Sequence, residues 1–227
     1  MAYSKWVNPT IAALWRYPVK SMLGERCEAL DVQAHGAKGD RRYAVRDAGG
    51  KLGSGKNSRV HRRFEGLFAF QAAYQGEVPV VAFPDGRRLS GDDPGIHAAL
   101  SAVFGEAVNL AEEPKGFHDA EPIHIVTTGS LERLGADERR FRANLVIETD
   151  EDETGWLGRS LQVGGVRLAV GRRTGRCVMV TMPQSELGEE PQLLRRLSVV
   201  GGDPLFGVYA EVLAPGRIRI GDQVVVS

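Results

Sequence analysis

Hydrophobic and polar positions alternate over short stretches of this chain, and glycines with other turn residues separate those stretches. Residues 217–220 read Arg-Ile-Arg-Ile, and a Gly-Asp turn then leads into the apolar run 224–226. A period of two residues is typical of a β-strand with one buried face. The same kind of pattern predicts further strands at 11–17, 42–46, 67–74, 78–83, 123–126, 145–148, 160–163, 166–170 and 177–181.

Three helices are predicted between these strands. Residues 92–94, Asp-Asp-Pro, supply an aspartate cap and a first-turn proline, and they predict a helix over 96–104. A second short helix is expected with Thr128 or Ser130 as its cap, and a third over 191–197, where a proline begins it. Many short strands with few helices predict a mainly β protein with a barrel or sandwich architecture.

Composition and charge narrow the possible partners. The chain has 29 basic and 29 acidic residues among 227, and 42% of its residues are hydrophobic, as in ordinary soluble domains. A balanced charge gives no support for binding nucleic acid or a membrane surface. Locally, 38–63 holds nine Lys or Arg against two Asp, and 148–153 holds five acids. Solvated surface explains both runs, although the basic run could also face an anionic ligand.

Two cysteines cannot form a disulfide framework, and they cannot supply the roughly four thiolates of an iron–sulfur cluster. Residues 1–10 are mixed and polar, so they do not resemble a secretory signal. No run of about 20 apolar residues is present, so no membrane-spanning segment is expected. We therefore expect a cytoplasmic protein.

One segment nearly matches a nucleotide-binding loop. Residues 50–57, Gly-Lys-Leu-Gly-Ser-Gly-Lys-Asn, follow the pattern G-x-x-x-x-G-K-[ST] except at the last position. Asn57 has no hydroxyl to hold magnesium, and the basic residues that follow lack the apolar stripe of a helix. The segment is interpreted as a turn between strands.

Cys177 is the candidate with the most specific chemistry. It follows a run rich in arginine and glycine over 172–176, and neighbouring arginines favour the thiolate form that binds soft metals, attacks electrophiles or carries sulfur. The alternative is a small buried hydrophobic residue at the start of a strand. Cys27 has no such surroundings and is interpreted as a structural thiol.

Several segments together resemble the MOSC family (molybdenum cofactor sulfurase C-terminal domain), in the arrangement that includes a MOSC N-terminal β-domain. Each match is weak alone, but all occur in the family's order and span about residues 11–226. The matching segments are 14–21 (Leu-Trp-Arg-Tyr-Pro-Val-Lys-Ser), 39–45 (Gly-Asp-Arg-Arg-Tyr-Ala-Val), 141–147 (Phe-Arg-Ala-Asn-Leu-Val-Ile), the pair Arg176-Cys177, and 203–209 (Asp-Pro-Leu-Phe-Gly-Val-Tyr) with 216–222.

This resemblance implies a MOSC N-terminal β-domain over 8–112 and a MOSC β-barrel domain over 113–227. It also implies a molybdenum cofactor (molybdopterin) held between them, as in the branch of the family that includes the mitochondrial amidoxime-reducing component and its bacterial counterparts. Carried over residue by residue, Cys177 is the metal ligand and a catalytic residue. The implied cofactor-binding residues are Lys20, Ser21, Arg41, Thr128, Arg142, Asn144, Gly175 and Arg176.

Ordinary structural roles stand beside these assignments. Lys20 fits a turn lysine, Arg142 an ion pair with an acid such as Glu148, Asn144 a turn cap, and Arg176 a surface residue. Proton delivery has only weak candidates, Asp203, which is taken as the second catalytic residue, and His124. Two positions depart from the family pattern: Ala143 replaces a frequent proline, and Gly175 replaces a small hydroxyl residue.

Three functions remain open on the sequence. The first is a reductase that needs no pyridoxal phosphate and reduces small N-hydroxylated or N-oxide-type compounds. Because the chain has no flavin or dinucleotide fingerprint, its electrons would come from a separate reductase. The second is a carrier that holds a persulfide or the cofactor through Cys177, and the third is a non-catalytic binding module. A monomer that binds neither nucleic acid nor membrane is expected.

Overall fold

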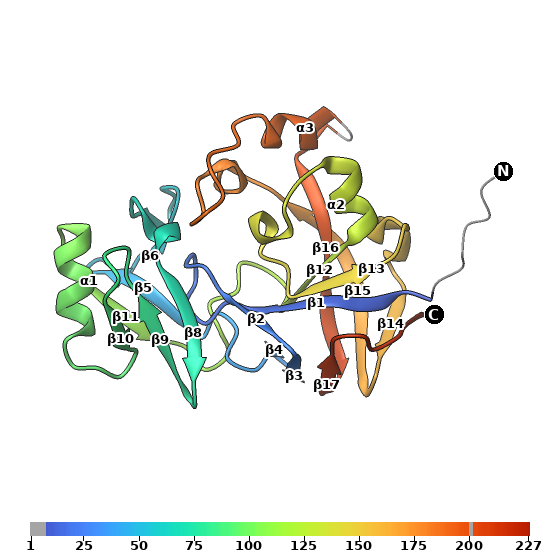
Figure 1. Cartoon of the computed structure of the whole chain (residues 1–227), viewed down its shortest axis with the longest axis horizontal. Coiled ribbons are helices and arrows are strands. Elements are labelled where there is room, and N and C mark those ends of the chain that lie inside the picture. The colour runs from blue at the N-terminus through green and yellow to red at the C-terminus, as the bar shows by residue number, and fades with distance from the viewer. Residues whose placement is uncertain (1–7, 200–201) are drawn as a thin grey trace.

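The computed structural model describes residues 8–199 and 202–227, and in it the chain forms two β-rich lobes side by side (Figure 1). The large lobe contains an eight-stranded sheet, a three-stranded sheet and two helices, whereas the small lobe contains sheets of three and four strands and one helix. The mainly β fold with a few short helices is therefore confirmed. Among the described helices, none is both long and apolar enough to cross a bilayer.

The large lobe takes its elements from both ends of the chain. Its strands are β1 (Thr10–Arg16), β2 (Glu25–Cys27), β3 (Ala29–Gln33), β4 (Gly36–Ala37), β12 (Ile123–Thr127), β13 (Leu145–Glu148), β14 (Ser160–Val163), β15 (Val166–Gly175), β16 (Leu205–Ala214), β17 (Gly216–Arg219) and β18 (Val224–Val226). Its helices are α2 (Thr128–Leu134) and α3 (Leu193–Val199), with 3₁₀ turns η2 (Glu138–Phe141), η3 (Glu153–Trp156) and η4 (Val178–Thr181).

The small lobe is built from the chain between these parts. Its strands are β5 (Tyr43–Asp47), β6 (Leu52–Ser54), β7 (His61–Arg63), β8 (Gln71–Gln75), β9 (Val78–Ala82), β10 (Arg88–Ser90) and β11 (Val108–Glu112). It also holds α1 (Ile96–Phe104), where the sequence predicts a helix, and the 3₁₀ turn η1 (Leu67–Ala69). The near match to a nucleotide-binding loop falls on β6 and its flanking turns, and strand β7 follows it rather than a helix.

The eight-stranded sheet runs in the order β18-β14-β15-β16-β12-β13-β1-β2. Its edges are β18 and β2, so the described strands form an open sheet rather than a closed barrel. Strand β1 pairs antiparallel with β13, with Leu14 opposite Leu145, while β12 and β13 pair in parallel. Strands from the first 37 residues are thus integral to the large lobe, and the domain boundary at 112/113 stays a prediction.

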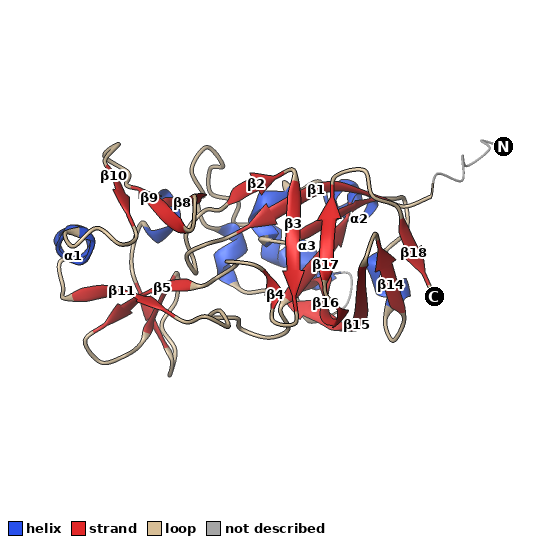
Figure 2. Cartoon of the chain, turned by 90° about the horizontal axis from the view of Figure 1, so that it is seen from below, coloured by secondary structure: helices blue, strands red, loops and turns tan. Residues whose placement is uncertain are grey.

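Alternation along the central strands creates two cores, one on each face of this sheet. Ile125 and Leu145 face the sheet β17-β3-β4, which crosses one side of the large lobe (Figure 2). Val126 and Val146, the next residues along each strand, face α2, α3 and η2. Because successive side chains of a strand point to opposite faces, short apolar strands can support both layers at once. A third core fills the small lobe.

Three local expectations are wrong. The strand predicted over 67–74 begins only at Gln71, as β8, because residues 67–69 form the 3₁₀ turn η1. The residues after Cys177 form the 3₁₀ turn η4 instead of a strand, because β15 continues to Gly175 and already pairs there with β16. In η4 the Thr181 hydroxyl donates to the Val178 carbonyl at 2.7 Å. The cap of α2 is Thr127 rather than either predicted residue, and its hydroxyl oxygen accepts from the backbone N–H of Ser130.

Leu14→Ala is expected to lower the free energy of unfolding by about 2–5 kcal/mol. The Leu14 side chain is fully buried on a strand paired with both β2 and β13, so its removal leaves a cavity in the core that links the chain's two ends. Urea unfolding measures the change. Leu213→Ala on β16 is the control, because Leu213 is 47% exposed, and similar losses in both variants would contradict the placement of β1.

Candidate functional site

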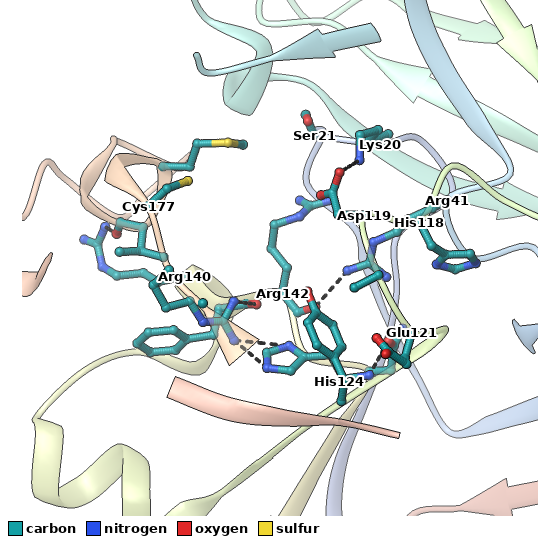
Figure 3. A pocket seen from close by; sticks show the side chains of 18 of the residues that line it. Lys20, Ser21, Arg41, His118, Asp119, Glu121, His124, Arg140, Arg142 and Cys177 are labelled. Atoms are coloured by element: carbon teal, nitrogen blue, oxygen red, sulfur yellow. Dashed lines mark hydrogen bonds and ion pairs between the residues drawn. The ribbon is translucent and has the colours of Figure 1, made fainter. Parts of the chain in front are cut away.

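A pocket lies at the junction of the two lobes, and most residues that line it are polar or charged (Figure 3). The segment after β1 contributes Lys20 and Ser21, the turn before β5 contributes Arg41, and the linker between β11 and β12 contributes 118–121. The large lobe contributes the residues around η2, the end of β15 and the turn η4. Segments distant in sequence therefore meet in one cavity.

The backbone around the pocket is strained. Ser21, Arg41 and Arg142 all line it, and all three have left-handed backbone angles with φ of 63°, 51° and 55°. Only one other described non-glycine residue, Ser185, has a positive φ, and it follows Gln184, which also lines the pocket. Such conformations are unfavourable for residues with a Cβ, and they concentrate at functional sites, where packing holds them. The strain supports a ligand-binding role for this cavity.

Lys20 is a buried cation at the small-lobe side of the pocket. Its ammonium donates to the Asp119 carboxylate at 2.6 Å and to the Phe117 carbonyl at 3.1 Å. Burial lowers the pKa of Lys20, and Asp119 partly opposes that shift. The Asp119 side chain is 65% exposed, so its ion pair with Lys20 is open to water and can be exchanged for another anion.

Arg41 and Arg142 both lie against the buried aromatic ring of Tyr17. Their guanidinium carbons lie 5.1 Å and 4.3 Å from the ring centroid. Arg41 pairs with the buried Asp40 and also donates to the Arg142 carbonyl at 3.0 Å. Arg142 donates through Nη1 to the Met22 carbonyl, but its buried Nη2 has no hydrogen-bond partner among the described residues. Burial, and then the Arg41 charge, lowers the pKa of Arg142 to about 10.

Arg176 is committed to the protein itself. Its Nε and Nη2 donate to the Phe206 carbonyl at 2.9 and 2.7 Å, and its Nη1 donates to the Phe141 carbonyl at 3.1 Å. Nη2 also contacts Nε2 of His124. Burial lowers the pKa of Arg176 to about 10 and holds the pKa of His124 well below its ordinary value, with the Arg176 charge as the next cause. His124 is thus neutral and serves as an acceptor for Arg176.

Cys177 is a half-buried free thiol that lines the pocket directly after Arg176. Its carbonyl accepts from the backbone N–H of Val180, which closes the turn η4. The other cysteine, Cys27, lies on β2, and burial raises its pKa to about 11. Among the described residues, no three His, Cys, Asp or Glu side chains are grouped so that they could hold a metal ion.

Asn144 and Gly175 also line the pocket. The Asn144 amide ties two strands together, since its oxygen accepts from His124 N at 3.2 Å and its nitrogen donates to the Trp15 carbonyl at 3.3 Å. Gly175 faces open space, with no atom within 4 Å of where a Cβ would lie. The absence of a side chain there leaves room beside Cys177.

Thr128 and Asp203 are the two predicted residues that the structure leaves outside this pocket. Thr128 begins α2, and its hydroxyl exchanges hydrogen bonds with the backbone of Thr149. Asp203 is exposed on the loop before β16. The remaining predicted residues come together: Lys20, Ser21, Arg41, Arg142, Asn144, Gly175, Arg176 and Cys177.

Other residues of the pocket are not singled out by the sequence. His118 and Asp119 belong to a segment that the sequence predicts only as a linker. Phe68 and Met179 provide apolar wall, and Gln184 lies beyond the turn η4. None carries a motif of its own. Met179 and Gln184 could have been suspected only because they are close to Cys177 in the sequence.

The chemistry of this cavity suits an anionic ligand that also reaches a thiol. Four guanidinium groups and one ammonium line it, and only two carboxylates do, Asp119 and Glu121. An unpartnered, buried Arg142 Nη2 has lost its hydration, so a hydrogen-bonding anion there would recover that cost. Arginine and lysine are the residues that bind phosphate groups best, as a fork and as a point charge.

Two family models match consecutive parts of the chain. The MOSC N-terminal beta barrel domain matches residues 8–100, and the MOSC domain matches residues 112–225. Together they cover most of the sequence and both lobes.

Curated relatives match over nearly the whole chain at low identity. "Mitochondrial amidoxime-reducing component 1" of Mus musculus is 24% identical, over 95% of this chain and 81% of that protein. "Mitochondrial amidoxime reducing component 2" of Bos taurus is 22% identical, over 95% and 82%. The crystal structure of the YUAD protein from Bacillus subtilis gives a TM-score of 0.49 at 15% identity, over 97% of this chain and 96% of that one.

His124→Gln is expected to weaken the dependence of the free energy of unfolding on pH below about pH 6.5. Unfolded His124 binds a proton below about pH 6.5, whereas the folded residue does so only at much lower pH. Wild type therefore loses stability as pH falls from about 6.5, by up to about 1.4 kcal/mol per unit from this group. Glutamine keeps an acceptor for Arg176 without that titration.

Urea unfolding at pH 7.5 and 5.5 measures the difference for wild type and variant. His61 and His118, whose pKa values burial also lowers, leave a residual slope in the variant. His35→Gln, at an exposed position, is the control. Equal pH dependence in wild type and His124→Gln would show that folding does not lower the pKa of His124.

Proposed function

This chain belongs to the MOSC family, and we propose that it is a molybdenum-cofactor-dependent oxidoreductase that reduces N-hydroxylated or N-oxide-type compounds. One observation carries the proposal: the thiol of Cys177 and the buried cations of both lobes line a single pocket. The names of the curated relatives, amidoxime-reducing components, support the reaction class.

The cationic side of the pocket would hold the anionic end of the cofactor. Lys20 and Arg41 would supply charge, and Arg142 would donate through the Nη2 that has no partner in the described part of the chain. Binding there requires the exposed Asp119 to give up or share Lys20. Because Lys20 is buried and Arg41 and Arg142 are only partly exposed, solvent screens their attraction for a phosphate less than it would at an open surface.

Cys177 would be the protein ligand of the metal. A molybdenum cofactor bound here would supply the two-electron chemistry that cleaves an N–O bond and releases water. The hydrogen bonds of Arg176 to the Phe206 and Phe141 carbonyls fix the chain just before Cys177. The thiol and the phosphate-binding cations would thus be held at a fixed separation by rigid backbone rather than by mobile side chains.

A separate reductase as electron donor, a monomeric state and a cytoplasmic location belong to the same proposal, and they rest on the sequence reasoning alone. The alternative is a carrier that holds a persulfide on Cys177. A half-buried thiol facing a cavity suits that chemistry as well, so the experiment below distinguishes the two functions.

Cys177→Ser is expected to lose both metal and activity. Wild type made in a host that produces the cofactor should contain about one molybdenum per chain and reduce benzamidoxime with a chemical electron donor. Serine offers a hard, protonated oxygen in place of the soft thiolate that molybdenum prefers. Metal analysis and a turnover assay measure both properties.

Cys27→Ser is the matched control, because Cys27 is the other free thiol and lies outside the pocket. It should keep metal and activity. Wild type without molybdenum, or equal metal in wild type and Cys177→Ser, would falsify the proposed function. A mass increase of one sulfur atom on Cys177 in metal-free wild type would instead establish the carrier.

A further inference from the structure

Gln184 has a buried side-chain amide with no hydrogen-bond partner. The residue is 2% exposed and lines the pocket that contains Cys177. Neither Nε2 nor Oε1 meets a donor or acceptor within the described residues. An unpaired buried amide costs free energy that folding does not return, and native proteins rarely leave both ends of one unpaired. We therefore expect a ligand in the pocket to supply the hydrogen-bond partners of this amide.

The backbone around Gln184 keeps this amide inside the pocket. Gln184 and Leu187 exchange two backbone hydrogen bonds, at 2.8 and 2.9 Å, across a tight turn. Ser185, within that turn, has a φ of 50°, in the left-handed region that a residue with a Cβ avoids. A turn that is strained and doubly bonded holds its first residue in one orientation.

Arg140 fixes both ends of the same segment. Its Nη1 donates to the Val180 and Met182 carbonyls at 3.3 Å each, and its Nη2 donates to the Gly188 carbonyl at 2.7 Å. Glu190 completes the set by pairing with its Nε at 2.9 Å. One buried guanidinium therefore clamps the chain before and after Gln184, so rotating the amide out to water would break this network.

Gln184 belongs to the Cys177 side of the pocket. Arg140, which clamps its segment, lies beside Cys177, whereas Lys20 and Ser21 lie across the cavity (Figure 3). The amide is neutral, so it suits a different ligand group from the anion that Lys20 and Arg41 would bind. A ligand group that meets Gln184 needs both a hydrogen-bond donor and an acceptor, because the amide presents one of each.

We propose that the Gln184 amide recognises the substrate, by pairing with an amidine-type N-hydroxylated group. In such a group, one carbon bears an NH₂ donor, and the oxime oxygen on the same side of the C=N bond is an acceptor. A carboxamide presents the complementary acceptor and donor along one edge, so two parallel hydrogen bonds can form. A tertiary N-oxide has an acceptor only and would leave Oε1 unpaired. This inference rests on the function proposed above.

The cost of an unpaired polar group explains why the Gln184 amide would discriminate between substrates. A site built to bond a donor rejects a compound that lacks it, because the site's own group is then left buried and unpaired. Gln184 should therefore favour amidoximes over N-oxides. The pterin edge of the cofactor offers similar donors and acceptors, so the test must separate the two sources.

The test compares Gln184→Met, which keeps length and volume, with wild type. The kcat/KM for benzamidoxime should fall about 10- to 100-fold, mainly through KM, whereas that for pyridine N-oxide should change less than about twofold. Gln192→Met, at an exposed position next to α3, is the matched control and should change neither. Gln184→Leu is the second apolar variant in case Met does not fold.

The outcomes separate the possible errors. Equal losses on both compounds, or none on either, overturn the role of Gln184. A variant that loses molybdenum places the amide on the cofactor and overturns the substrate assignment. Wild type that reduces neither compound refutes the proposed function, and the inference falls with it.

A second readout needs no activity. In cofactor-free protein, Gln184→Met should raise the Tm by about 2–4 °C relative to wild type and Gln192→Met, because it removes an unpaired buried amide. An unchanged or lower Tm would show that the amide is already satisfied, by the protein or by bound water, and would overturn the inference.

Discussion

Burial of arginine at the junction of the lobes is the constraint on which the rest of the structure depends. Arg140 is buried and Arg142 and Arg176 are partly buried, so each loses hydration that backbone carbonyls in part replace. A guanidinium needs several acceptors in fixed directions, so each one fixes the strands or turns that supply them. Carbonyls satisfy hydrogen bonds without cancelling charge, and within the described residues only Arg140 of the three also pairs with a carboxylate, that of Glu190, so the pocket stays positive.

Burying these arginines is energetically unfavourable, and the other unfavourable features of the structure lie in the same cavity. Arg142 and Arg176 are held as cations against burial, as their lowered pKa values show, and His124 stays neutral beside Arg176. Left-handed residues and unpaired amide or guanidinium atoms line the same walls. Proteins retain such unfavourable features where they serve binding, and repacking would remove them if stability alone mattered.

The sequence predicts strands either from a period of two residues, as in β14, or from a short apolar run, as in β13, whose first three residues are all buried. It fails after Cys177, where an apolar run packs only its third residue, Val180, against α3 and turns away from the sheet. The sequence also does not identify the cap of α2. Thr127, Thr128 and Ser130 all carry hydroxyls, and only tertiary geometry selects among them.

The candidate site follows a similar rule. The predicted residues that stand in short motifs meet in the pocket, but Asp203 stands in one too and remains on the surface. Gln184 and His118 reach the cavity through long-range packing, by a clamped turn and by the linker between lobes, for which one sequence holds no local signal.

The two sides of the pocket divide the work of recognition. Charge on the Lys20 side attracts an anion over distance and tolerates small errors of position, so it provides affinity with little discrimination. A neutral amide on the Cys177 side does the reverse, because its hydrogen bonds demand direction and its unpaired state penalises a wrong partner. The pocket can then discriminate between ligands through Gln184 without weakening the binding of the anion by Lys20 and its neighbouring cations.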